Sequence, residues 1–461
     1  MIEHSRIKKI HFAGIGGSGM SGIAEVLHNM GFQISGSDIA ENETVRRLVA
    51  KGIRIAIGHA RENVGAAEAL VYSSAITEDN VEVLEALKNK LPVIPRAEML
   101  AELMRMKFSL AVAGTHGKTT TTSMIAAILT QAGLDPTYVV GGKLKVQGSG
   151  AKLGFSRYLV AEADESDGSF LKLFPTIAVI TNIENDHLEF YGRMKKLLSA
   201  FREFAEKVPF YGAVILNAEC PNIKKIMPAI RKKIVTYGFS AGADVRAVDV
   251  KTSGFASSYR LLVQGQDRGP LRLSVGGRHN VANSLAAVSA ALEVGVSLET
   301  IRASLENFSL PERRFQVLLA GPSLLVIDDY AHHPSEIKAT LKTLRSSSCR
   351  RVIAVFQPHR FTRLQILMKQ FATAFRAADI LIITKLYSAN QREIPGINSR
   401  VLADHIRSQG QENVFYLDSF PEISEFLRQQ LRDGDGLVFL SAGNLTQLAH
   451  DFAVEMEAQK K

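Results

Sequence analysis

The sequence has few cysteines and no apolar run of membrane-spanning length. Its 461 residues include only two cysteines, Cys220 and Cys349, which excludes a disulfide framework and a cysteine-rich zinc site. No apolar run reaches the roughly 18 residues that a membrane-spanning helix needs. The first residues carry neither an apolar signal core nor a small-residue cleavage site. We therefore expect a cytoplasmic protein without membrane insertion.

Long charge runs of one sign are also missing. Lys and Arg number 55 against 46 Asp and Glu, which gives a formal net charge of +9. Nucleic acid is the first interpretation of such an excess. The chain has no long basic run and no alternation of basic and aromatic residues that would stack bases. An anionic small-molecule substrate explains the excess as well, and we expect no nucleic-acid partner.

The composition is that of a globular protein with several domains. Hydrophobic residues make up 46% and charged residues 22% of the chain, which supplies enough apolar material for several cores and excludes disorder as the main state. At about 150 residues per domain, the length indicates about three domains. Short apolar strands alternate with amphipathic helices over most of the chain, which predicts α/β domains with parallel sheets.

The places where this alternation restarts predict three domains. We place them at residues 1–106, 107–314 and 315–461. The first and last have the pattern of doubly wound domains. Residues 244–275 differ, because their short alternating strands predict a small antiparallel patch. In the last domain we expect a helix over residues 363–377.

A glycine-rich turn follows the first predicted strand. Residues 14–19 read Gly-Ile-Gly-Gly-Ser-Gly and open a helix, and Asp38 ends the next predicted strand. Glycines let the backbone approach a pyrophosphate, and the helix N-terminus offers free N–H groups. The motif alone leaves three interpretations open: a tight turn without a ligand, a dinucleotide site, or a site for a nucleotide diphosphate.

A second glycine turn has the features of a phosphate-binding loop. Residues 114–120 read Gly-Thr-His-Gly-Lys-Thr-Thr and lie between an apolar strand and a long helix. Lys118 would contact the β- and γ-phosphates, and Thr119 or Thr120 could bind Mg²⁺. The strict Walker pattern asks for glycine where this chain has Val112. Because the strand, loop and helix follow in the right order, we expect a central P-loop domain.

Acidic residues and histidines follow several other predicted strands. Residues 162–167 read Glu-Ala-Asp-Glu-Ser-Asp, and Asn182, Asp186 and His187 follow the next strand. Acidic side chains beside a P-loop are natural Mg²⁺ ligands, although a solvated acidic loop is equally consistent with this segment alone. In the last domain, His332 and His333 lack a zinc-binding spacing. Together with the segment 358–363, they favour a cationic pocket for carboxylates.

Taken together, these segments resemble the Mur ligase family. The segments GIGGSGM, GTHGKTTTT, EADESD, TNIENDH, GRHNVANSLAA, RRF, DDYAHHP and FQPHRFTR follow one another in this family's order from Gly14 to Arg363. The resemblance implies an α/β fold with an N-terminal Rossmann-like domain for the UDP-sugar. A central P-loop mononucleotide-binding ATPase domain would follow, with a C-terminal Rossmann-like domain for the amino acid.

The resemblance also implies a reaction in peptidoglycan precursor synthesis. An ATP-dependent amide-forming ligase would join L-alanine to the carboxylate of UDP-N-acetylmuramate through an acyl phosphate, with ATP and Mg²⁺ as cofactors. A sibling ligase that attaches a murein tripeptide during wall recycling is the alternative. A nicotinamide oxidoreductase would leave the P-loop unexplained, and a nucleotide-binding module without activity would not need the complete set of catalytic residues. We expect a monomer or a homodimer.

The family's functional residues carry over to matching positions of this sequence. The UDP-sugar site would comprise Gly16, Gly17, Ser18, Gly19, Asp38, Ser73 and Ser74. The ATP site would comprise Gly114, Thr115, His116, Gly117, Lys118, Thr119, Thr120, His279, Asn283, Arg314 and Asp329. The metal would be bound by Thr119, Glu162 and His187, and the amino acid by His332, His359, Arg360 and Arg363. The residues expected in catalysis are Lys118, Glu162, His187 and His332.

Overall fold

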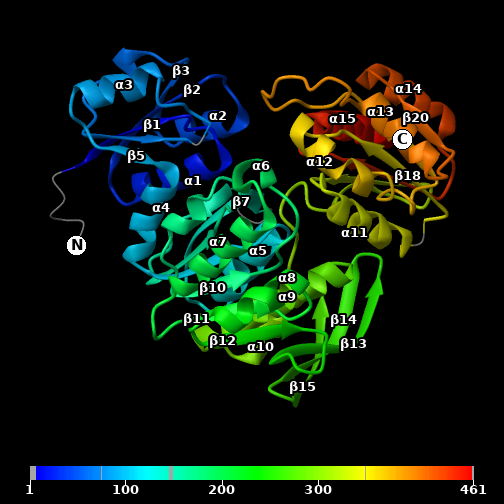
Figure 1. The fold of residues 1–461 in the computed structure, drawn as a ribbon, viewed down its shortest axis with the longest axis horizontal. Coiled ribbons are helices and arrows are strands. Elements are labelled where there is room, and N and C mark those ends of the chain that lie inside the picture. Colours follow the sequence, from blue (N-terminus) through cyan, green and yellow to red (C-terminus); the bar gives the residue numbers. More distant parts are fainter. Residues whose placement is uncertain (1–6, 74, 145–148, 348, 459–461) are drawn as a thin grey trace. The chain divides into compact units, whose positions relative to one another are not determined.

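The structure is a computed structural model that describes residues 7–73, 75–144, 149–347 and 349–458. The described residues form three β-sheets with flanking helices, coloured along the chain in Figure 1. Its Cα positions form two compact units. Unit 1 comprises Met1–Arg246 and Asn283–Ser304, and unit 2 comprises Ala247–Ala282 and Leu305–Lys461. This architecture confirms the expected α/β fold.

The first sheet has the strand order of a doubly wound nucleotide-binding domain. Its order is β3-β2-β1-β4-β5, and each strand pairs in parallel with its neighbours. The strands are β1 (Lys9–Ala13), β2 (Gln33–Asp38), β3 (Arg54–Ile57), β4 (Ala69–Tyr72) and β5 (Val93–Pro95). The helices are α1 (Ser18–Asn29), α2 (Glu43–Ala50), α3 (Val81–Lys88) and α4 (Arg96–Arg105). Because β2 and β4 flank β1, the chain reverses its direction of winding there, where such folds bind ligands.

The second sheet places the phosphate loop at a similar point. Its order is β15-β14-β13-β12-β11-β10-β6-β9-β7-β8. The strands of its first half are β6 (Phe108–Ala113), β7 (Thr137–Leu144), β8 (Ser149–Lys152), β9 (Tyr158–Glu162) and β10 (Ile177–Ile180). The loop after β6 leads into α5 (Lys118–Gln131), and β6 pairs in parallel with both β9 and β10. The segments that follow these three strands therefore meet at one edge of the sheet.

The same sheet continues into an antiparallel hairpin. Its remaining strands are β11 (Ala213–Asn217), β12 (Ile234–Gly238), β13 (Val245–Ser253), β14 (Ala256–Val263) and β15 (Gln266–Leu273). Strands β14 and β15 pair antiparallel, which confirms the antiparallel patch expected in residues 244–275. The helices of this part are α6 (Leu188–Tyr191), α7 (Met194–Glu206), α8 (Pro221–Ile226), α9 (Arg278–Val294) and α10 (Leu298–Glu306).

The third sheet belongs to unit 2 and has the order β16-β17-β21-β18-β19-β20. Its strands are β16 (Gln316–Ala320), β17 (Leu324–Asp329), β18 (Arg351–Phe356), β19 (Ile380–Ile383), β20 (Val414–Tyr416) and β21 (Asp435–Leu440). Strand β16 pairs antiparallel with β17, and the other neighbouring strands of this order pair in parallel. The helices are α11 (Pro334–Arg345), α12 (Phe361–Phe371), α13 (Ser399–Ser408), α14 (Phe420–Gln430) and α15 (Leu445–Ala458).

One predicted helix is too long. Helix α12 ends at Phe371, whereas the alanine-rich sequence predicts a helix through Ala377. Beyond Phe371, the N–H groups of Ala374 and Ala378 bond to carbonyl groups three residues earlier, in tight turns. These turns bring the chain into β19, so tertiary packing overrides the high helix propensity of alanine. No helix among the described residues has the length and apolarity needed to cross a membrane.

Candidate active site

The glycine turn after β1 is held by the end of β2. The N–H groups of Gly14 and Ile15 donate to the carbonyl oxygen of Ser37, at 2.9 and 3.0 Å. Gly16 N–H donates to Asp38 Oδ2 at 2.7 Å. Gly14 has φ of +76°, a conformation that favours glycine. Asp38 therefore holds the turn in shape through this hydrogen bond. The sequence motif predicts a ribose-binding acid at this position and does not reveal the contact with the turn.

The space around the turn explains further glycines and adds one residue. A Cβ on Gly16 would lie 2.8 Å from Asp38 Oδ2, and one on Gly19 would lie 2.4 Å from the guanidinium of Arg96. Arg96 also lies 3.7 Å from Asp164 of the acidic segment. Sequence analysis missed Arg96, which begins α4 and belongs to none of the quoted motifs. Its guanidinium lies on the first turn of α1.

The other described residues expected at the UDP-sugar site also lie near the glycine turn. Gly17 is the N-cap of α1 and Ser18 is its first residue. Ser73 lies beside Gly14, since a Cβ on that glycine would be 3.0 Å from the Ser73 Cβ. Ser74 lies outside the described residues. The structure thus brings all the described members of this set to the carboxyl ends of β1, β2 and β4.

The phosphate loop is tightly surrounded by polar groups. Gly114 has φ of +134°, and a Cβ there would lie 2.1 Å from Thr181 Oγ1. Gly117 has φ of +81°, and its Cβ would lie 2.5 Å from Asn283 Oδ1. Both positions need glycine for conformation and for space. Asn283, expected at the adenine, therefore lies beside the loop within unit 1.

Hydrogen bonds from the segment after β10 fix the middle of the loop. Glu184 N–H donates to Thr115 Oγ1 at 2.8 Å, and His116 N–H donates to Asn182 Oδ1 at 2.9 Å. Thr181 Oγ1 donates to the His116 carbonyl at 2.6 Å. These hydrogen bonds connect the loop to the segment after β10 and restrict its conformation, which favours preorganised phosphate binding.

Lys118, the first residue of α5, points at the acidic segment after β9. Its Nζ lies 2.7 Å from the Gly114 carbonyl and 2.9 Å from Glu165 Oε1. Its side chain is 14% exposed and that of Glu165 is 1% exposed. Burial alone would lower the pKa of Lys118, but the charges of Glu165, Asp164 and Glu162 together raise it. The lysine is therefore a buried cation facing three carboxylates.

Thr119 and Glu162 form a pair of oxygen donors suited to a hard cation. Thr119 Oγ1 lies 3.0 and 3.2 Å from the two carboxylate oxygens of Glu162. Adjacent oxygen ligands of an octahedral Mg²⁺, each about 2.1 Å from the metal, lie about 3 Å apart. The residues present therefore fit the metal. Gly141 N–H donates to Glu162 Oε2 at 2.9 Å and orients that carboxylate. Thr120 is buried in the next position of α5.

His187 is close to the same acidic segment. Its Nε2 lies 3.9 Å from Glu165 Oε1 and 3.5 Å from Asp186 Oδ2. Its backbone has φ of +56°, in the left-handed region that costs a non-glycine residue energy. Such strain is typical of functional positions. A nitrogen ligand is less usual for Mg²⁺ than the oxygens of Thr119 and Glu162.

In unit 2, the segments after β17 and β18 bring the expected amino-acid residues together. The rings of His332 and His359 have centroids 5.9 Å apart. Arg363 Nη1 lies 3.2 Å from His359 Nδ1. Tyr387 stacks on His359 with centroids 5.7 Å apart and an interplanar angle of 6°. Sequence analysis missed Tyr387, because it follows β19 in a segment without a recognisable motif.

Arg360 takes part through its backbone. It has φ of +68°, is the N-cap of α12, and donates its N–H to the Tyr387 carbonyl at 2.9 Å. His332 Nδ1 lies 2.9 Å from the Tyr330 carbonyl and 3.6 Å from Glu336 Oε2. These contacts fix the orientation of the His332 ring and the direction in which α12 starts.

Arg314 and Asp329 both lie next to Tyr330, at the start of the segment that follows β17. The guanidinium of Arg314 lies 5.0 Å from the ring centroid of Tyr330. Asp329 accepts N–H groups from Phe315 at 2.8 Å and Ala331 at 2.7 Å. Burial raises the pKa of Asp329 to about 6, although the charge of Arg314 opposes this shift. His279, also in unit 2, lies beside Gly277, where a Cβ would be 2.6 Å from its ring.

Glu336 is a third residue that the sequence did not predict. His333 is the N-cap of α11, and Glu336 completes a capping box with it. The Glu336 carboxylate accepts the N–H groups of His332 and His333, at 3.1 and 3.2 Å. The sequence signal was present, since an N-cap followed three residues later by glutamate is typical of a helix start, but histidine is an unusual N-cap.

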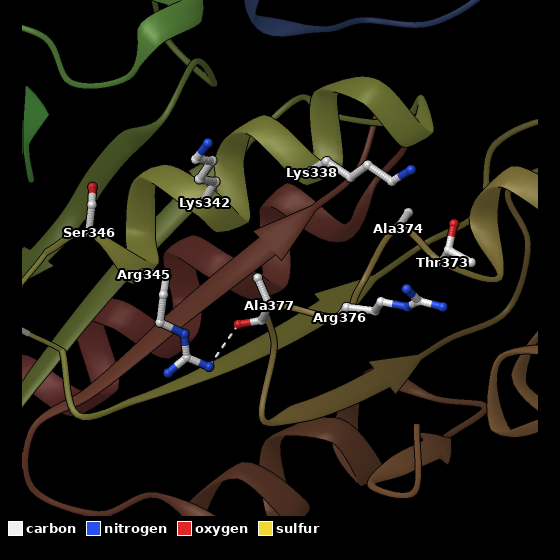
Figure 2. Close-up of a pocket in the computed structure, with 8 residues that line it drawn as sticks. All are labelled: Lys338, Lys342, Arg345, Ser346, Thr373, Ala374, Arg376 and Ala377. Atoms are coloured by element: carbon white, nitrogen blue, oxygen red, sulfur yellow. Dashed lines mark hydrogen bonds between the residues drawn. The ribbon is translucent and has the colours of Figure 1, made fainter. Parts of the chain in front are cut away.

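A cavity in unit 2 lies apart from these residues. Its volume is about 520 Å³. Figure 2 shows its lining, in which four basic side chains come from α11 and from the turns after α12. The lining residues are Lys338, Lys342, Arg345, Ser346, Thr373, Ala374, Arg376 and Ala377. None of the expected site residues lines it. Lys342 and Arg345 lie in the last turn of α11, where the helix dipole favours cations.

Family models match the three parts of the chain in order. The model described as "Mur ligase family, catalytic domain" matches residues 9–108. The "Mur ligase middle domain" matches residues 112–291, and the "Mur ligase, glutamate ligase domain" matches residues 313–443. The glycine turn, the phosphate loop and the histidine cluster each fall within one of these matches.

Relatives of known activity are similar over almost the whole chain. The UDP-N-acetylmuramate–L-alanine ligase of Geobacter sp. (strain M21) is 47% identical over 99% of this chain and 100% of its own length. That of Trichlorobacter lovleyi is 49% identical over 96% and 98%, respectively.

Solved structures agree with these relatives. The crystal structure of UDP-N-acetylmuramate–alanine ligase from Thermotoga maritima superimposes with a TM-score of 0.84 at 29% identity, over 98% of this chain and 100% of that one. A murein peptide ligase from Psychrobacter arcticus has a TM-score of 0.71 at 25% identity, over 97% and 98%. Three Mur ligase family models match successive parts of the chain, and the relatives align with it over almost their full length. This chain therefore belongs to the Mur ligase family.

Proposed function

We propose that this chain is an ATP-dependent ligase that joins L-alanine to the carboxylate of UDP-N-acetylmuramate in peptidoglycan precursor synthesis. The observation that carries the proposal is the 47–49% identity to ligases of that name over 96–99% of the chain. A tripeptide-adding sibling is not favoured, because the murein peptide ligase superimposes less well than the alanine ligase.

The first chemical step would be attack of the muramate carboxylate on the γ-phosphorus of ATP. A carboxylate–phosphorus bond forms, the bond to the β,γ-bridging oxygen breaks, and ADP leaves. Both reactants are anionic, so catalysis rests on positioning and on charge neutralisation. We assign that neutralisation to Lys118. Within the loop at residues 114–120, we assign phosphate binding to the backbone N–H groups of residues 117–120, because those of Thr115 and His116 already bond to Asn182.

Magnesium would be held by Thr119 and Glu162, with His187 close by. When bound, it neutralises phosphate oxygens and orients the γ-phosphate. The fit rests on the oxygen donor pair described above. Asn283 and His279 are assigned to the adenine, and Arg314 and Asp329 to ATP as well.

The UDP-sugar is assigned to the first sheet and the amino acid to the third. The first turn of α1, which begins at Ser18, would present its positive helix N-terminus to the diphosphate, with Asp38 holding the preceding glycine turn. His332, His359, Arg360 and Arg363 would bind the carboxylate of alanine, for which a guanidinium is suited. We retain the boundaries 1–106, 107–314 and 315–461 as the domains that carry these sites.

The second step would be attack of the alanine amine on the acyl phosphate carbon. The carbon–nitrogen bond forms, inorganic phosphate leaves, and the amine loses a proton. We assign the receipt of that proton to His332, whose ring is oriented by the Tyr330 carbonyl. Water would hydrolyse the acyl phosphate, so we propose that the substrate-bound domains close around it.

Phosphate release from ATP tests the proposal directly. The reaction mixture contains Mg²⁺ and UDP-N-acetylmuramate, with L-alanine, with a murein tripeptide, or with no amine. We expect release that depends on L-alanine. Release only with the tripeptide would assign the chain to recycling, and no release with any amine would refute the ligase. The cytoplasmic location remains a prediction that cell fractionation would test. The monomeric or homodimeric state remains a prediction that sedimentation would test.

A further inference from the structure

The ammonium group of Lys118 has no spare hydrogen-bond donor in this structure. A lysine carries three N–H groups, and Lys118 Nζ has three acceptors within reach. These are the Gly114 carbonyl at 2.7 Å, Glu165 Oε1 at 2.9 Å and the Thr115 carbonyl at 3.4 Å. To contact a nucleotide phosphate, Lys118 has to exchange at least one of them.

Glu165 is the acceptor that conflicts with a phosphate. The carbonyls of Gly114 and Thr115 are neutral and belong to the loop itself, whereas Glu165 carries a carboxylate whose side chain is 1% exposed. Two anions, the carboxylate and a phosphate, would then share one buried ammonium. Because both side chains are buried, solvent screens the two negative charges less than at the surface, and their repulsion is stronger.

The Glu165 side chain can move without unfolding its loop. Its backbone carbonyl accepts from Tyr191 Oη at 2.6 Å and from Gly168 N–H at 3.1 Å. Its second carboxylate oxygen, Oε2, is buried and has no hydrogen-bond partner among the described residues. The backbone is therefore anchored independently of the carboxylate, whose hydrogen-bond partner is Lys118 at 2.9 Å, with His187 Nε2 farther away at 3.9 Å.

The two glutamates of the acidic segment thus have separate partners. Glu162 faces Thr119, where the metal is assigned, and Glu165 faces Lys118. We propose that Glu165 is a positioning residue that competes with nucleotide phosphate for Lys118. It holds the ammonium in the nucleotide-free loop and gives it up when a nucleotide binds. This inference rests on the proposed binding of adenine nucleotides to that loop.

Titration calorimetry with ADP in magnesium-free buffer tests the competition. Glu165→Gln keeps the shape of the side chain and removes its charge. We expect it to bind ADP about tenfold more tightly than the parent, the change that loss of one charged hydrogen bond supports. Glu165→Asp keeps the negative charge but, with a shorter side chain, holds it farther from Lys118. Its affinity for ADP should therefore lie between those of the parent and Glu165→Gln. An unchanged or weaker affinity in both variants would overturn the proposal, because a merely structural role predicts weaker binding.

Two matched variants on the same segment distinguish the direct contact with Lys118 from a general effect of negative charge near the loop. Asp167 bonds to Ser169 N–H at 2.9 Å, and Asp167→Asn should leave the ADP affinity unchanged. Asp164 acts on Lys118 through its charge, with no hydrogen bond between them. If Asp164→Asn tightened binding as much as Glu165→Gln, competition for Lys118 would be wrong. If the parent failed to bind ADP both in this buffer and with Mg²⁺ added, the proposed function would fail as well.

Discussion

Thr119 Oγ1 lies 3.0 and 3.2 Å from the two carboxylate oxygens of Glu162. This contact joins the first turn of α5 to the end of β9. It places a hydroxyl and a carboxylate where both could bind one metal ion next to the phosphate loop. The contact arises because β6 and β9 are parallel neighbours whose following segments leave the sheet at the same edge.

Glu162→Gln should reduce turnover at least about a hundredfold and raise the Mg²⁺ concentration needed for half-maximal rate. The amide keeps the size of the side chain but removes the negative charge that favours a divalent cation. Steady-state rates measured across a Mg²⁺ titration check this. Glu203→Gln, at an exposed position of α7, serves as the control and should behave like the parent. An unchanged Mg²⁺ dependence in Glu162→Gln would remove this residue from the metal site.

Lys118→Ala should abolish measurable phosphoryl transfer while UDP-N-acetylmuramate still binds. The lysine is assigned to the β- and γ-phosphates, and the UDP-sugar to the first sheet. Phosphate release and calorimetry with the UDP-sugar measure the two effects separately. Lys195→Ala changes an exposed lysine on α7 and should retain both properties. Normal turnover by Lys118→Ala would contradict the assignment of the phosphate loop.

His332→Ala should raise the KM for L-alanine at least about tenfold and change the KM for ATP much less. The imidazole lies with His359 and Arg363 in the cluster assigned to the amino acid. Initial rates with each substrate varied in turn give the two constants. The control is His405→Ala, in the last turn of α13. Equal changes in both constants would refute the pocket assignment.

Glu82 should make the first sheet sensitive to acid. It lies fully buried at the start of α3, where it accepts hydrogen bonds from Ser37 and Asn63, each at 2.6 Å. Burial alone would raise the pKa of Glu82, but contacts with His11, Ser37 and Asn63 lower it to about 2. Because this pKa lies below the unfolded value of 4.5, the ionised form stabilises the fold above pH 4.5. That stabilisation, about 3 kcal/mol, is lost as the pH falls towards 2.

Urea unfolding of the parent and of Glu82→Gln at pH 7, 4 and 3 measures this contribution. Hydrogen-exchange labelling of peptides from the first sheet reports the transition. The difference in unfolding free energy between the two proteins should shrink as the pH falls. A difference that stays constant over this range would show that the charge of Glu82 contributes nothing to stability.

The sequence motifs predicted the secondary structure better than they predicted which side chains contact one another. The bounds of β1 and β6 follow directly from the sequence, because each is a short apolar run that ends in a glycine turn. Strand β8 was missed, since its sequence, Ser-Gly-Ala-Lys, has low strand propensity. Strand β7 was missed although its first four residues, Thr-Tyr-Val-Val, favour a strand. The overlong helix at residues 363–377 shows the opposite error, in which high propensity yields to tertiary packing.

The candidate site shows the same limit. The phosphate loop and the acidic segment were both found, but the ion pair between Lys118 and Glu165 joins residues 47 positions apart. Which of two nearby glutamates reaches the lysine depends on the backbone path after β9, and the sequence does not specify that path. Arg96 and Tyr387 were missed for a related reason, since each acts from a segment that carries no motif of its own.

The central claim is that the muramate carboxylate is phosphorylated before alanine attacks it. UDP-N-acetylmuramate labelled with ¹⁸O in that carboxylate tests this claim most directly. With ATP, Mg²⁺ and L-alanine, the account predicts that each inorganic phosphate released carries one labelled oxygen. Phosphate without the label, or labelled phosphate released at the same rate when L-alanine is omitted, would contradict it.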